Sequence, residues 1–144
     1  MSVIVCATNA GEDSRAVHTA AFRRAAEAGT PVVFLHVIGG AAYTEQPERM
    51  REAIRKEMKW LLHALVAVAR DRSGADDVEA STVLRTGDPR VEILAYLTEA
   101  DAGSLLIGVP REGDTSIFSG HSFDEFVTEA EAFDVHVELV STGD

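Results

Sequence analysis

The sequence predicts a single α/β domain, spanning residues 1–144, built on a doubly wound parallel sheet of five strands with helices on both faces. Three observations support this prediction. Short apolar runs alternate along the chain with segments of helical periodicity. A helix-length segment separates each pair of runs, and strands joined in this way are parallel, with right-handed crossovers. The chain has 144 residues and is 46% hydrophobic, which is enough for one domain with its own core.

The order β-α-β-α-β-α-β-α-β is expected along the chain. The expected strands cover residues 2–7, 31–38, 78–85, 104–107 and 135–140, and the expected helices cover about 14–28, 47–72, 89–99 and 122–132. Asp88 is a helix cap with Pro89 in the first helical position, and Gly29 is a helix stop. The third strand alternates between polar and apolar residues, which predicts a place near an edge of the sheet. Residues 39–44 are expected to form a loop.

Helical spacing predicts which side of the long second helix faces the core. Its expected apolar stripe consists of Met50, Ile54, Met58, Leu61, Leu62, Leu65 and Val68. Cys6 lies in an apolar run and is expected to be a small buried core residue.

The composition limits the classes of binding partner and the cellular compartment that are expected. Lys and Arg total 13 and Asp and Glu total 24, so the net charge of −11 disfavours nucleic acids and anionic membranes as partners. No apolar run approaches the ~20 residues of a membrane span, and no signal peptide is visible. A single cysteine forms no intrachain disulfide, so a reducing compartment, the cytoplasm, is expected.

A ligand of such a sheet binds beyond the carboxyl ends of the strands, where the strand order reverses. For a domain of this size the reversal is expected between the first and fourth strands, so loops 8–12 and 108–121 are the candidate site, with residues 37–40 as a wall. Catalytic motifs are absent from the sequence: it has no Walker A motif, no GxGxxG after the first strand and no GxSxG. The five histidines and Cys6 show no metal-ligand spacing, so neither an enzyme nor a metal site is predicted.

Four stretches, taken in order, resemble the universal stress protein family over nearly the full length. "SVIVCATNAGEDSRAV" is similar to the opening strand and its Val-Asp-Gly-Ser-x-x-Ser loop, and "VVFLHVIGG" to a second strand ending in His-Val. "TVLRTGDPRVEILAY" is similar to a third strand with a Gly-x-Pro helix start, and "LLIGVPR…GHSFDEFV" to the fourth strand, glycine loop and Gly-Ser helix start. The resemblance implies a Rossmann-like, adenine nucleotide alpha hydrolase-like sheet with strand order 3-2-1-4-5.

The family contains members that bind ATP and members that do not. The binders resemble a pattern of Gly, two residues, Gly, nine residues, Gly, then Ser or Thr, in which glycines let backbone N–H groups approach the phosphates. Laid from Gly108, this pattern places Arg111 and His121 at the second and third glycines and Ser122 at the hydroxyl. The first and last positions match and the middle two do not.

On the adenine side, the resemblance places Asn9 at the family's Asp and Ala10 at the glycine that follows it. Asn can still hydrogen-bond an adenine edge. Val37 would supply backbone contacts to the base. The resemblance therefore implies a nucleotide site made of Asn9, Val37, Gly108, Arg111 and Ser122, with ATP or AMP as the ligand.

The charges of the glycine loop argue against strong binding. Arg111 could clamp a phosphate, but Glu112 and Asp114 repel one. Each lost phosphate contact costs about 1.5–3 kcal/mol, so losing two would weaken a micromolar site to roughly millimolar.

We therefore expect a non-catalytic regulatory protein with a degenerate nucleotide loop and an unidentified protein partner. The resemblance also implies a homodimer that pairs the terminal strand, Val135 to Val140, across a two-fold axis. The alternatives are an ATP- or AMP-binding sensor that regulates a partner protein or transporter, and a nucleotide hydrolase, which the missing Walker lysine disfavours.

Overall fold

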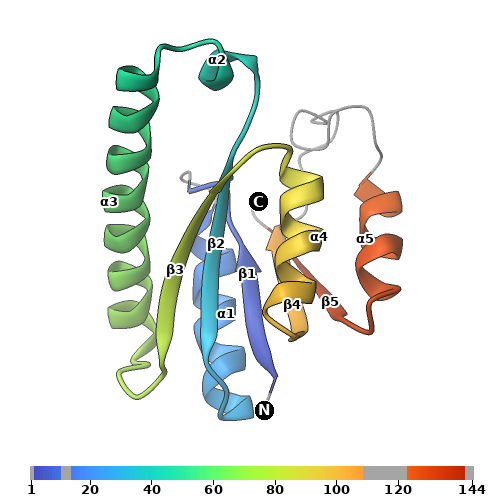
Figure 1. The fold of residues 1–144 in the computed structure, drawn as a ribbon. Coiled ribbons are helices and arrows are strands. Elements are labelled where there is room, and N and C mark those ends of the chain that lie inside the picture. The colour runs from blue at the N-terminus through green and yellow to red at the C-terminus, as the bar shows by residue number, and fades with distance from the viewer. Residues whose placement is uncertain (1, 11–13, 109–122, 142–144) are drawn as a thin grey trace.

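The computed structural model describes residues 2–10, 14–108 and 123–141. Its five strands form one sheet in which every neighbouring pair is parallel, in the order β3-β2-β1-β4-β5 (Figure 1). The strands are β1 (Val3–Ala7), β2 (Val32–Ile38), β3 (Ala80–Thr86), β4 (Ala102–Gly108) and β5 (His136–Val140). The predicted fold class and strand order are confirmed, and β3 and β5 lie at the two edges, as expected.

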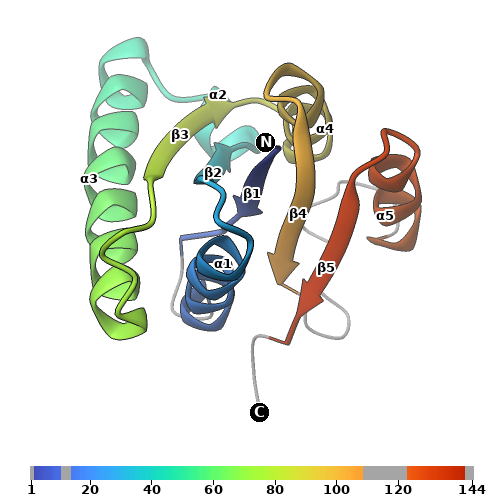
Figure 2. The same cartoon turned by 90° about the horizontal axis from the view of Figure 1, so that it is seen from below.

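The helices form a layer on each face of the sheet. They are α1 (Ser14–Ala28), α2 (Ala41–Thr44), α3 (Glu48–Ser73), α4 (Pro89–Glu99) and α5 (Phe123–Glu131). Figure 2 shows α1 and α3 on one side of the strands and α4 and α5 on the other. None of the helices in the described part of the chain is long and apolar enough to cross a membrane.

Alternation along β1 divides the core between the two layers. Ile4 and Cys6 pack in the cluster beneath α1 and α3, whereas Val5 and Ala7 pack in the cluster beneath α4 and α5. Cys6 is fully buried, as predicted, and burial raises the pKa of its thiol well above the usual range. The central strand is therefore covered on both faces, which explains its unbroken apolar sequence.

The apolar stripe predicted for α3 is only partly correct. Leu62 is buried, but Met50 and Val68 are 49% and 52% exposed, and Val66 and Ala69 are buried instead. At about 100° per residue, Met50 and Val68 each lie about 120° around the helix from Leu62. Steps of four residues from Leu62 back to Met50 each overshoot the turn by about 40°, and steps of three from Leu62 on to Val68 each fall about 60° short, so the predicted stripe drifts off the face that contacts the sheet.

Residues 39–44, predicted to be a loop, contain the short helix α2. Tyr43 is its buried residue, and the phenol oxygen accepts a hydrogen bond from the Arg55 guanidinium at 2.6 Å. This contact ties α2 to α3 across the end of β2. A single buried aromatic ring among small and polar residues gives too little periodicity to predict a helix.

The end of β2 also fits closely against the turn before α4. The Gly87 amide donates to the Ile38 carbonyl at 3.0 Å, and a Cβ at Gly39 would lie 2.5 Å from the Gly87 carbonyl oxygen. Asp88 caps α4 as predicted, because its carboxylate accepts from the Arg90 amide at 3.0 Å.

Candidate functional site

The switch point lies at the carboxyl end of β1, between β2 and β4. Ala7 is in register with Leu35 of β2 and with Ile107 of β4. The residues that follow these three therefore leave neighbouring strands at the same carboxyl end of the sheet. The predicted site residues Asn9, Val37 and Gly108 follow at or just beyond these ends. The predicted residues Arg111 and Ser122 lie outside the described residues. We call the loop 8–10 with the end of β2 the base side, and the end of β4 with the start of α5 the phosphate side.

Thr8 is the centre of the base side. Its amide donates to the Leu35 carbonyl at 2.9 Å, and its hydroxyl oxygen accepts from the Ala10 amide at 3.0 Å. Two histidines complete its bonding: His18 Nε2 shares a hydrogen bond with the hydroxyl at 2.7 Å, and His36 Nδ1–H donates to the Thr8 carbonyl at 2.8 Å. Backbone and side chain of Thr8 are both fixed, which sets the path of the chain as it leaves β1.

Both histidines are held in their neutral form by the protein interior. His18 is 1% exposed, and burial lowers its pKa to about 4. Burial also lowers the pKa of His36, against the opposing effect of its bond to Thr8. A neutral His36 that donates through Nδ1 keeps its Nε2 lone pair.

The metal-ligand spacing and the His-Val strand ending gave no sign that these two histidines bond Thr8. A signal was present for His18, which lies one helical turn before Phe22 on the buried face of α1. Its ring packs edge-on against Phe34 of β2, with 5.3 Å between ring centroids. A polar residue on a buried helical face needs a partner, and Thr8 is that partner.

The loop after Thr8 has a backbone that normally favours glycine. Ala10 has φ 59, in the left-handed region, and is buried. The resemblance places a family glycine at this position, and here alanine adopts the left-handed backbone that glycine would favour. Asn9 before it is exposed at the edge of the site, and Val37 is half-buried against the core under α4 and α5.

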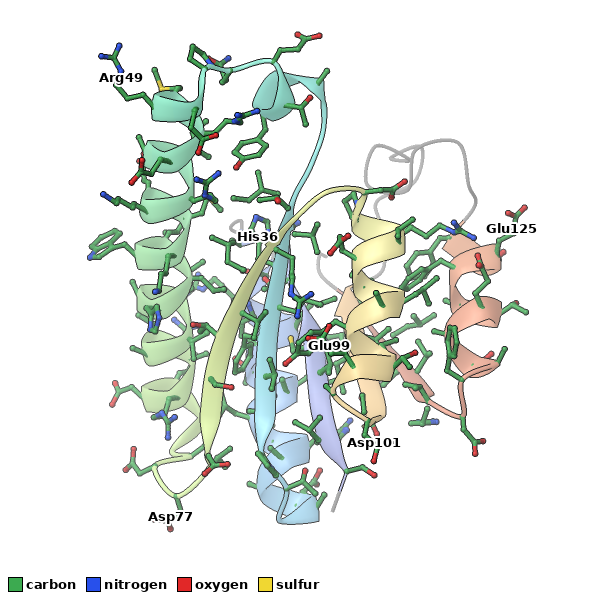
Figure 3. The ribbon with its side chains drawn as sticks, in the orientation of Figure 1. His36, Arg49, Asp77, Glu99, Asp101 and Glu125 are labelled. Carbon is green, nitrogen blue, oxygen red and sulfur yellow. The ribbon has the colours of Figure 1, made fainter. Side chains whose placement is uncertain are left out.

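The phosphate side begins with acidic side chains. Helix α5 starts at Phe123, and its first turn contains Asp124 and Glu125. Glu125 lies at the N-terminal end of α5 (Figure 3). A helix N-terminus attracts anions through its unpaired N–H groups and dipole. Here two carboxylates already complement that partial charge, and they repel a phosphate approaching the same turn.

Arg90, in the first turn of α4, is engaged within the fold. Its guanidinium binds both carboxylate oxygens of Glu129 on α5, with Nε 2.9 Å from Oε1. The bidentate pair joins α4 to α5 and engages Nε and Nη2 of this guanidinium. Over the described ranges, no group of three His, Cys, Asp or Glu residues could hold a metal ion.

Comparisons with known proteins agree with this architecture. The model of the Universal stress protein family matches residues 1–139. No curated protein matches the chain in sequence. A solved universal stress protein in complex with cAMP has a TM-score of 0.71 at 16% identity, with 99% of this chain and 98% of that chain covered.

Two further solved structures are similar. The universal stress protein from Archaeoglobus fulgidus in complex with dAMP has a TM-score of 0.65 at 19% identity, covering 98% of each chain. A universal stress protein family protein from Arabidopsis thaliana with AMP bound has a TM-score of 0.59 at 16% identity, covering 99% of this chain and 93% of that chain. At these identities the likeness is one of fold. The family model spans nearly all of the sequence, and the chain therefore belongs to the universal stress protein family.

Proposed function

We propose that this chain is a non-catalytic regulatory protein of the cytoplasm that works as a homodimer and binds adenine nucleotides weakly. One observation carries the proposal: the two sides of the candidate site are unequal. Thr8 organises the base side with four hydrogen bonds, whereas acidic residues occupy the first turn of α5 on the phosphate side. The base side can accept an adenine base, but the carboxylates of the phosphate side repel the triphosphate.

The sequence of the glycine loop supports weak binding independently. Arg111 and His121 stand where the binding pattern has glycine, and side chains at such positions restrict the approach of backbone N–H groups to phosphate. The net charge of −11 adds a general repulsion toward a nucleotide.

The edge strand β5 supports the homodimer. Leu139 on β5 is 47% exposed and Phe133, just before the strand, is 51% exposed. An edge strand presents unpaired backbone groups, and pairing it with a second copy would satisfy them and cover these side chains. Light scattering should give twice the monomer mass, and Val137→Pro should give a monomer because proline removes a ladder donor. A monomeric wild-type protein would contradict this part of the proposal.

The known complexes support a second candidate function, a nucleotide-gated sensor that regulates a partner protein. Structures of similar fold were solved with cAMP, dAMP and AMP. In this alternative Asn9, Val37, Gly108, Arg111 and Ser122 would form the site.

Calorimetry separates the two candidates. We expect ATP and AMP, with and without Mg²⁺, to bind with a Kd weaker than about 100 μM, which is about 5.5 kcal/mol. The double variant Arg111→Gly/His121→Gly should then bind ATP at least about tenfold tighter, because it regains two backbone contacts. Tight wild-type binding that Arg111→Glu abolishes would favour the sensor.

A turnover assay tests the non-catalytic part of the proposal. We expect no hydrolysis of ATP with Mg²⁺ above background. Turnover that is lost on Arg111→Ala would show an enzyme instead.

A further inference from the structure

Helix α3 has a charge opposite to that of the rest of the chain. It contains seven of the 13 basic residues and four of the 24 acidic ones, a net charge of +3. The remainder has six basic and 20 acidic residues, a net charge of −14. Both lysines of the protein, Lys56 and Lys59, are on this helix.

Some of these cations are used within the fold. Arg51 and Arg55 pair with Glu48 at 2.6 and 3.2 Å, and Arg70 donates to the Val78 carbonyl at 2.7 Å. They fix α3 to itself, to α2 and to the turn before β3, and they add little to its outer surface.

The other cations face solvent. Arg49 projects away from the molecule at the N-terminal end of α3 (Figure 3), and Lys56, Lys59 and Arg72 are exposed. Lys56 lies 3.6 Å from Glu52 in a fully solvated pair, and Lys59 forms no ion pair with any residue that the structure describes. Exposed pairs of this kind are weak, so these charges are available to a partner.

Large apolar side chains share this outer surface. Trp60 is 70% exposed, Val68 52% and Met50 49%. They lie within an arc of about 80° and span about 27 Å along the helix. Exposed apolar groups rimmed by charge mark interaction sites, and an exposed tryptophan is the residue type most often at the energetic centre of one. We call Met50, Lys56, Lys59, Trp60 and Val68 the α3 outer face; the exposed carboxylates of Glu57 and Asp71 lie within the same arc.

We propose that the α3 outer face docks an acidic amphipathic helix of a partner protein. A row of apolar side chains along one helix fits a row at i, i+3, i+4 and i+7 on a second helix. The flanking cations select carboxylates on that second helix. The inference rests on the proposed regulatory function, because it names the kind of partner that such a regulator would bind.

A protein helix suits this surface better than an anionic bilayer does. Lipid-binding segments cluster about four to eight cations, whereas the four exposed cations of α3, Arg49, Lys56, Lys59 and Arg72, are interspersed with the exposed carboxylates of Glu52, Glu57 and Asp71. A flat bilayer would also lie against more of the acidic remainder of the chain than one helix would.

Trp60 is the only tryptophan, so its fluorescence reports directly on the α3 outer face. The probe is a synthetic 20-residue helical peptide with leucine along one face and glutamate flanking it. We expect a saturable blue shift of the emission, with an affinity at least about fivefold weaker at 500 mM than at 50 mM salt. The control peptide has lysine in place of each glutamate and should give no shift.

Two matched variants locate the site, and both keep the reporter. Lys56→Glu/Lys59→Glu should weaken binding of the acidic peptide at least tenfold. Arg15→Glu/Arg23→Glu makes the same change in net charge at exposed positions of α1 and should leave binding unchanged. Thermal unfolding confirms that each variant is folded.

The absence of any shift with the acidic peptide would overturn the inference, as would an equal shift with the lysine peptide. A shift with phosphatidylglycerol vesicles in place of the acidic peptide would assign the face to lipid. The dimer and nucleotide assays are independent of this readout. A weakly nucleotide-binding dimer that ignores the peptide contradicts the inference alone, and a monomer that binds it contradicts the proposed dimer alone.

Discussion

The base side and the phosphate side of the candidate site are built at the same carboxyl ends of the strands, yet they differ in their contacts. On the base side, Thr8 is bonded to the buried His18 and the half-buried His36, and the path of the loop is set by the fold. On the phosphate side, carboxylates stand at the start of α5 and Arg90 is bound to Glu129. The difference teaches that the backbone path at this end of the sheet and the charges beside it are set separately. Core packing maintains the first, and a few surface residues decide the second.

The largest expected effect is a loss of stability at acidic pH, caused by protonation of His18 on the base side. The pKa of His18 is about 4 in the folded protein and about 6.5 when unfolded, so the unfolded chain binds more protons between these values. Its stabilising contribution is complete above pH 6.5 and is lost as the pH falls toward 4, at a cost of about 3 kcal/mol. His36 acts in the same direction.

Urea unfolding at pH values from 7 to 4.5 measures the slope of the free energy of unfolding against pH. His18→Gln should flatten it, whereas His63→Gln, at an exposed position on α3, should leave it as in the wild type. An unchanged slope in the His18 variant would show that other groups carry the pH dependence.

A smaller effect breaks the base side through its backbone. Ala10→Val puts a β-branched residue at φ 59, and we expect it to lower the free energy of unfolding by about 1–3 kcal/mol. Ala10→Gly relieves the strain but loses a buried methyl group, so its change should stay within about 1 kcal/mol. Equal stability of the valine and glycine variants in urea unfolding would argue against the strained loop.

The smallest expected effect is a change in ATP affinity when acidic side chains of the phosphate side are neutralised. Asp124→Asn and Glu125→Gln remove anionic charge from the first turn of α5, and each should tighten ATP binding about two- to fivefold. Glu131→Gln, at the other end of the helix, is the control and should leave affinity unchanged. If all three variants bind like the wild type in calorimetry, charge at this turn does not limit binding.

Strong local signals made most of the fold predictable. Asp88 and Pro89 marked the start of α4 correctly, and the apolar run after Ser2 predicted β1 to within one residue. Strand β4 extends from Ala102 to Gly108, beyond the predicted 104–107, because Ala102 and Gly103 have low strand propensity and only pairing reveals them. The error at Met50 and Val68 came from repeated steps of four and of three residues along a helix of about 3.6 residues per turn.

The grouping of the candidate residues was predictable, but their contacts were not. The ends of parallel strands gather at one edge, so Asn9, Val37 and Gly108 could be grouped from the sequence. The Arg90–Glu129 pair joins residues 39 positions apart, and any of the exposed acidic residues could have been the partner. Such pairings depend on how two helices pack, which no local pattern encodes.

The contact at Gly39 has a consequence for how this sequence can vary. Any β-carbon there would collide with the Gly87 carbonyl, whereas a β-carbon at Gly29 meets nothing within 4 Å and only the φ of 66 disfavours it. In a deep mutational library, only glycine should therefore be tolerated at position 39, whereas asparagine should also be tolerated at position 29. These two glycines look alike in the sequence but differ in how freely they can be substituted. The position at the β2–α4 junction, Gly39, is the more restricted.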